Sequence, residues 1–131
     1  MIPLHLTISG FLSYREAVEL DLTGIDLACI SGANGAGKSS LLDAITWVLF
    51  GEARKRDDSV INSGAKAAEV RLVFEYEGLY YRVLRSKPRE KTMLLEFHIL
   101  QSVAETGSAA PRPWMDGVWK SITGRRHFTI C

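Results

Sequence analysis

Residues 32–39 read GANGAGKS, which matches the phosphate-loop pattern G-x-x-x-x-G-K-[ST] at every fixed position. Glycines let backbone N–H groups turn toward a phosphate because no Cβ blocks its approach. In this pattern Lys38 reaches the β- and γ-phosphates of a nucleotide, and the Ser39 hydroxyl coordinates Mg²⁺. At average residue usage the pattern arises by chance in roughly half a percent of chains this long. The pattern therefore predicts a nucleotide-binding loop.

The residues on either side of the loop have the character that such a loop requires. Segment 25–30 (IDLACI) is a short apolar run typical of a buried strand. In segment 40–50 apolar residues recur at helical spacing, and Gly51 follows where the helix can end. The start of that helix would direct its positive end toward a bound anion. We predict nucleotide contacts by Asn34, Gly35, Ala36, Gly37, Lys38, Ser39 and Ser40, with Ser39 also as the metal ligand.

Alternation of apolar and polar residues predicts several strands beyond the loop. Leu4, Leu6 and Ile8 are expected on one face of the first strand. Gly78 separates two alternating runs and marks the clearest hairpin. Strands are predicted at 3–9, 18–22, 25–30, 70–76, 79–85, 94–100 and within 114–120, with 18–22 and 25–30 as an antiparallel pair. The predicted fold class is α/β: a P-loop NTPase with a mixed, antiparallel-rich sheet around one P-loop helix.

Composition sets broad limits on the function. The 131 residues are 47% hydrophobic, enough for one domain with a core. The net charge of +1 gives no global attraction to nucleic acid. No apolar run reaches the roughly 18 residues of a membrane span, and the N-terminus lacks a signal-peptide pattern, so we expect no membrane contact and a cytoplasmic location. Three scattered histidines do not have metal-ligand spacing.

Three segments together resemble the N-terminal head segment of SbcC-type exonuclease subunits, in the SMC-like branch of the ABC ATPases. They are 10–15 (GFLSYR), the phosphate loop with its helix through Gly51, and 54–62 (RKRDDSVIN). The likeness spans roughly residues 1–102. In this family the loop after the P-loop helix touches the base side of the nucleotide, which here implies Ile61, Asn62 and Ser63. In some relatives an arginine contacts the base from the position that Leu12 occupies here, and Arg15 lies nearby in the sequence.

The resemblance also implies cofactors and partners. The N-terminal and C-terminal halves of one long chain form a single ATPase head, and a coiled coil separates them in sequence. Two heads form a homodimer around two ATP molecules, with Mg²⁺. A nuclease partner of the SbcD type completes a complex that cleaves double-stranded DNA ends. The implied function is the ATP-binding lobe of a DNA double-strand-break repair ATPase.

The end of the chain departs from this pattern. Residues 125–131 (RRHFTIC) do not resemble the helix that precedes the family's Q-loop, and no signature motif, Walker B motif or coiled coil is found. We therefore assign 1–102 to the N-terminal lobe and 103–131 to a loop with an atypical tail, and expect a fragment or an altered reading frame. Segment 72–75 (LVFE) is the nearest candidate for a Walker B motif, but its alternation is typical of a hairpin strand. We therefore assign no catalytic residue. We expect weak nucleotide binding and negligible hydrolysis by this chain alone.

Two other functions remain open. One is a stand-alone P-loop phosphotransferase, although a hairpin after the loop helix is unlike the alternating strands and helices of small kinases. The other is a non-catalytic, truncated nucleotide-binding module. A further question concerns a group of cations that could either contact DNA phosphates or serve as a solubilising sheet edge. These cations are Arg82, Arg85, Lys87, Arg89 and Lys91.

Overall fold

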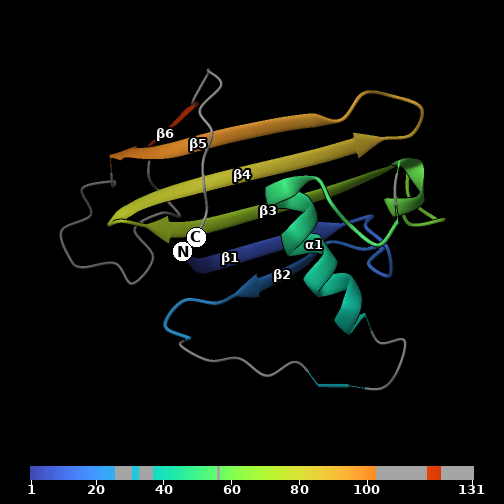
Figure 1. Ribbon diagram of the computed structural model, residues 1–131, viewed down its shortest axis with the longest axis horizontal. Helices are drawn as coiled ribbons and strands as arrows, with labels where there is room; N and C mark the ends of the chain where they lie inside the picture. Colours follow the sequence, from blue (N-terminus) through green and yellow to red (C-terminus); the bar gives the residue numbers. More distant parts are fainter. Residues whose placement is uncertain (26–30, 33–36, 56, 103–117, 122–131) are drawn as a thin grey trace.

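A computed structural model describes residues 1–25, 31–32, 37–55, 57–102 and 118–121. This part of the chain forms a six-stranded sheet with one α-helix against one face (Figure 1). The strand order is β2-β1-β3-β4-β5-β6, and every described pairing is antiparallel. The elements are β1 (Ile2–Ser9), β2 (Val18–Asp21), α1 (Lys38–Phe50), the 3₁₀ helix η1 (Asp57–Val60), β3 (Ala67–Tyr76), β4 (Leu79–Pro88), β5 (Leu94–Ser102) and β6 (Val118–Ser121).

The predicted hairpin is confirmed as β3 and β4, the central pair of the sheet. The two strands pair from Ala67 opposite Pro88 to Tyr76 opposite Leu79. The two residues between them, Glu77 and Gly78, have φ angles of 50° and 77°. Two consecutive positive φ angles give a tight turn whose twist matches that of the flanking strands. The turn therefore fixes the register of the longest pairing in the molecule.

The core lies between α1 and the sheet. Helix α1 packs on β3 and β4 and buries Ala44, Trp47 and Val48. The Trp47 ring lies 5.0 Å from the ring of Phe11, centroid to centroid. The predicted end of the helix at Gly51 is confirmed: this residue has φ 75° and its N–H donates to the Trp47 carbonyl at 2.8 Å. This packing holds the first turn of the helix at one edge of the core.

The prediction that Leu4 shares a face with Leu6 and Ile8 is wrong. Leu6 and Ile8 are buried against α1, but the β1–β3 pairing shifts between Pro3 and His5. A bulge of this kind adds one residue to a strand and reverses the side on which that residue points. Leu4 consequently packs with Val73 in a second cluster, together with Tyr80, Leu100 and Trp119.

A cation and a histidine lie on neighbouring strands beside the second cluster. The Arg82 guanidinium lies 4.7 Å from the centroid of the Trp119 ring. His98, opposite Arg82 on β5, has a buried Nδ1 with no hydrogen-bond partner among the described residues. Burial lowers the pKa of His98, and the positive charge of Arg82 lowers it further. The face of the sheet that points away from α1 therefore has an apolar cluster with a partly buried histidine and arginine beside it.

Several sequence predictions lie outside the described residues. These are the strand at 25–30 and its pairing, the loop at 105–113, and the tail at 122–131. The strand predicted within 114–120 is present as β6, and its pairing with β5 extends the sheet beyond residue 102. None of the helices in the described part of the chain has the length and apolar character to cross a membrane.

Candidate nucleotide-binding site

The phosphate loop leads into α1 through Gly37. This residue has φ 98° and ψ 10°, a left-handed conformation that favours glycine, and helical residues begin at Lys38. Within the described residues no side chain caps this end of the helix, and the first turn contains no acidic residue. The first amides of α1 and its positive end are therefore not neutralised by a carboxylate, as an anion site requires.

The loop that follows β1 closes the side of this helix start. Tyr14 Oη donates to the Gly37 carbonyl at 3.1 Å, and the Ser13 and Ser40 hydroxyls are 3.0 Å apart. A Cβ at Gly37 would lie 3.0 Å from Tyr14 Oη and 3.1 Å from its Cζ. The backbone angle therefore favours glycine here, and a side chain would also force the Tyr14 ring to shift.

The residues of the motif that carry a charge or a hydroxyl group, Lys38, Ser39 and the adjacent Ser40, lie in the first turn of α1. Lys38 Nζ donates to the Gly32 carbonyl at 2.6 Å, so the ammonium group lies beside the start of the loop. Ser39 is exposed and Ser40 is buried. An uncapped helix start, a lysine and two hydroxyls fit the phosphates of a nucleotide with a divalent cation. The predicted contacts Asn34, Gly35 and Ala36 lie outside the described residues.

A pocket of about 620 Å³ extends from the helix start to the segment after η1. Its size suits a nucleotide. Of the predicted contacts, Ser40, Ile61, Asn62 and Ser63 line it together, although 21 positions or more separate Ser40 from the others in sequence. Leu12 and Ser13 form another side.

Three further pocket residues, Arg54, Lys55 and Ser59, were not predicted. Their segment, 54–62, entered the sequence analysis only through its resemblance to SbcC-type head segments, which implied contacts for Ile61 and Asn62 alone within it. Arg54 forms an ion pair with Asp43, one turn inside the helix, and this contact brings the segment back over the helix start. The signal in the sequence is the pair of cations that follows the P-loop helix. It indicates a pocket contact only if the chain is known to fold back over the start of this helix.

Asn62 joins its own turn to the loop after β1. Its backbone N–H donates to the Gly10 carbonyl at 2.7 Å, and its Nδ2 donates to the Leu12 carbonyl at 2.6 Å. Its Oδ1 accepts the N–H of Gly64 at 3.0 Å. The side chain thus holds the pocket wall to the loop after β1. The nucleotide contacts of Ile61, Asn62 and Ser63 stay predictions.

The five cations considered as a DNA site do not form one patch. Arg85 is buried, with Nε donating to the Val48 carbonyl at 3.4 Å, whereas Arg82 lies on the opposite face of the sheet against Trp119. Lys87 donates to Asp58 at 2.8 Å, and Arg89 donates to two backbone carbonyls. Most of these charges therefore have structural contacts in the described part of the chain.

The fold and this site define a nucleotide-binding domain of the P-loop class. A family model described as an AAA domain, AAA_23, matches residues 5–111, and the chain belongs to this family. The fold resembles the SMC head domain from Thermotoga maritima with a TM-score of 0.56 and 26% identity, over 74% of this chain and 37% of that one. The predicted fold class is thereby confirmed.

Similar proteins narrow the class. The chain is 41% identical over 95 residues to the SbcC component of the SbcCD nuclease of Deinococcus radiodurans, across 70% of this chain and 10% of that protein. It is 38% identical over 90 residues to a probable DNA double-strand break repair Rad50 ATPase of Aquifex aeolicus, across 65% and 9%. The predicted resemblance is confirmed. The chain spans about a tenth of the length of these relatives.

Proposed function

We propose that this chain is the ATP-binding lobe of a DNA double-strand-break repair ATPase that acts with a nuclease. The observation that supports this most is the pocket that joins the first turn of α1 to residues 61–63. The likeness to SbcC and Rad50 proteins supports ATP as the nucleotide and an SbcD-type nuclease and double-stranded DNA as partners. The proposed place of action is the cytoplasm.

The chain's own residues bind and orient the nucleotide. Lys38 and the first amides of α1 neutralise the β- and γ-phosphates, and Ser39 is the proposed Mg²⁺ ligand. Leu12 and Ile61 provide apolar sides of the pocket. Bound Mg²⁺ would reduce the negative charge of the phosphates. We assign hydrolysis to the complete head dimer, because it also needs a second carboxylate on Mg²⁺ and a group that orients the attacking water, and no described residue is assigned either role.

The remaining partners are proposed from the surface of α1. Leu42 and Phe50 are each 57% exposed on the helix, away from its packing against β3 and β4. Exposed large apolar side chains on one helix favour a second layer of protein over it. We propose that the C-terminal half of the same head covers this face and that a second head completes the homodimer. In this arrangement residues 1–102 are the N-terminal lobe, and β6 at 118–121 adds to its sheet.

Calorimetric titration of the 131-residue chain with Mg-ATP tests the proposal. We expect weak saturable binding, reduced at least about tenfold by Lys38→Ala because a charged phosphate contact is lost. Lys120→Ala, which removes an exposed lysine on the far strand β6, is the matched control and should bind like the parent chain. Absence of binding, or binding that Lys38→Ala leaves unchanged, would contradict the proposal.

A further inference from the structure

Ile61, Asn62 and Ser63 form one wall of the pocket. Ser40 also lines the pocket and belongs to the first turn of α1, where phosphates bind. A nucleotide with its phosphates at this turn would extend its ribose and base toward the wall. What holds this wall in place therefore bears on recognition of the part of the ligand beyond the phosphates. This step rests on the proposed function.

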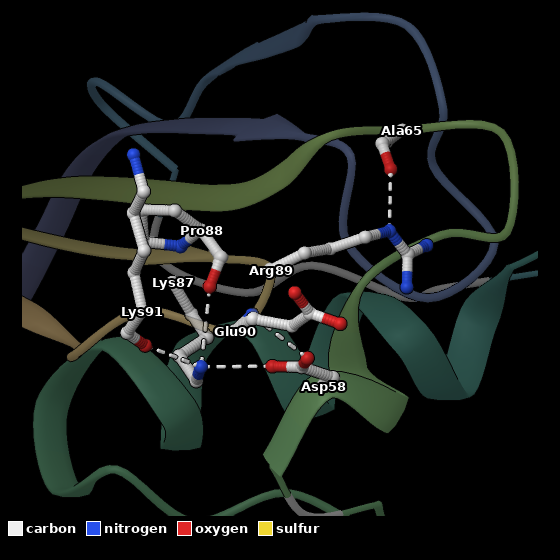
Figure 2. A network of polar contacts seen from close by, with 7 residues as sticks. All are labelled: Asp58, Ala65, Lys87, Pro88, Arg89, Glu90 and Lys91. Carbon is white, nitrogen blue, oxygen red and sulfur yellow. Dashed lines mark hydrogen bonds and ion pairs between the residues drawn. The ribbon is translucent and has the colours of Figure 1, made fainter.

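The Arg89 guanidinium group holds the turn that carries the wall from the side of β4, in addition to the bonds of Asn62 to the loop after β1. Arg89 Nη2 donates to the Asn62 carbonyl at 2.9 Å, and its Nε donates to the Ala65 carbonyl at 3.0 Å. Figure 2 shows the second of these bonds, with the Arg89 side chain extended toward Ala65. The Asn62 carbonyl also accepts the N–H of Ala65 at 2.9 Å. The planar fork of arginine thus bridges both ends of one turn, which a lysine ammonium cannot reproduce.

The segment just before the wall is held by the same β4–β5 turn. Lys87 Nζ donates to Asp58 Oδ1 at 2.8 Å, and the N–H of Glu90 donates to Asp58 Oδ2 at 3.0 Å (Figure 2). Lys87 also donates to the carbonyls of Pro88 at 3.1 Å and Lys91 at 2.6 Å. The hydrogen bonds that Asp58 accepts from Lys87 and from the N–H of Glu90 lower the pKa of Asp58, and the bond from Lys87 has the larger effect. The turn therefore holds η1 through Asp58 and the wall through Arg89.

None of the turn residues lines the pocket. We propose that Arg89 is a positioning residue for the nucleotide pocket: it fixes the wall at 61–63 from behind, and thereby sets affinity for the ribose and base without contacting the ligand. Among the described residues, the Arg89 side chain donates to Asn62 and Ala65 and not to the start of α1, and it reaches the loop after β1 only through Asn62. Loss of Arg89 should therefore affect the two ends of a nucleotide differently.

Parallel titrations with ATP and inorganic tripolyphosphate, both with Mg²⁺, separate these ends. In the 131-residue chain Arg89→Ala should weaken ATP binding about tenfold and tripolyphosphate binding less than about twofold. Arg89→Lys keeps the charge but not the fork, and should recover only part of the ATP affinity. The matched control is Lys91→Ala, since the Lys91 side chain points away from the network in Figure 2 and only its carbonyl accepts a bond.

The ratio of the two affinities decides the outcome. If Arg89→Ala has the same ratio of ATP affinity to tripolyphosphate affinity as the parent chain, including the case in which both ligands are weakened equally, the inference is overturned while the proposed function stands. A parent chain that binds neither ligand overturns the proposed function and the inference together. If thermal unfolding shows that Arg89→Ala is not folded, the ratio in Arg89→Lys decides by the same criterion.

Discussion

At the scale of single residues, Gly37 is constrained by two independent features. Its φ of 98° is strained for any residue with a side chain, and a Cβ would lie 3.0 Å from Tyr14 Oη. We expect Gly37→Ala to lower the free energy of unfolding by about 2–3 kcal/mol, measured by urea denaturation.

Gly24→Ala separates the two causes. Gly24 has φ 73° but no atom within 4 Å of an added Cβ, so only the backbone strain of about 1 kcal/mol applies. Tyr14→Phe removes both the atom nearest the added Cβ and the hydrogen bond to the Gly37 carbonyl, so it should cost less in the Gly37→Ala background than in the parent chain. Equal losses for the two glycine variants would show that the ring contact contributes nothing.

Single residues also show how far sequence can predict a site. Gly37, Lys38 and Ser39 could be predicted as phosphate contacts because eight consecutive residues specify the loop, and these contacts stay predictions. Arg54 and Lys55 were missed because the pocket exists only once the chain after α1 folds back. Leu4 was misplaced because alternation predicts the face of a regular strand but not a bulge, which depends on the partner strand.

At the scale of elements, the end of α1 was predictable from Gly51, but the group that neutralises it was not. The last turn of α1 contains no basic residue. Arg85 of β4 supplies the missing charge: its Nε donates to the Val48 carbonyl at 3.4 Å, and its Nη1 lies 2.9 Å from Met93 Sδ. A cation near a helix C-terminus interacts favourably with the helix dipole. Burial lowers the pKa of Arg85, so desolvation offsets part of this gain.

We expect Arg85→Met to lower the free energy of unfolding by about 1–2 kcal/mol, because methionine fills the space but neither donates to Val48 nor carries charge. The measurement is urea denaturation followed by the helix signal in circular dichroism. Arg71→Met is the matched control: Arg71 is exposed and its ion pair with Glu69 is long, at 4.0 Å, so a change within about 0.5 kcal/mol is expected. An equal effect of both substitutions would show that Arg85 does not cap the helix.

The hairpin and the remaining strands differ in how far sequence could place them. The register of β3 and β4 follows from a two-residue turn, Glu77-Gly78, which is visible in the sequence. The pairing of β1 with β3 could not be deduced in the same way, because the chain between these two strands contains α1 and η1. Pairing across so long a connection is set by the shared core under α1, which includes Leu6 and Leu72.

At the scale of the whole molecule, α1 has one packed face and one exposed face. Ala44, Trp47 and Val48 are buried against the sheet, whereas Leu42 and Phe50 are each 57% exposed. Burial of a large apolar side chain stabilises a fold by about 1.5–3 kcal/mol, so the stability of this chain depends on the first set and not on the second. The exposed set is available for association with another protein surface.

We therefore expect the double variant Leu42→Lys, Phe50→Lys to change the free energy of unfolding by less than about 1 kcal/mol while reducing self-association, measured by sedimentation velocity. By comparison, Trp47→Ala should cost about 3–5 kcal/mol because it leaves a cavity in the core. Leu79→Lys, at the tip of the β3–β4 hairpin and 47% exposed, controls for added charge and should leave self-association unchanged. If the double variant unfolds as readily as Trp47→Ala, this face of α1 already contributes to the fold of the isolated chain. In that case no second layer of protein is needed to explain its apolar side chains.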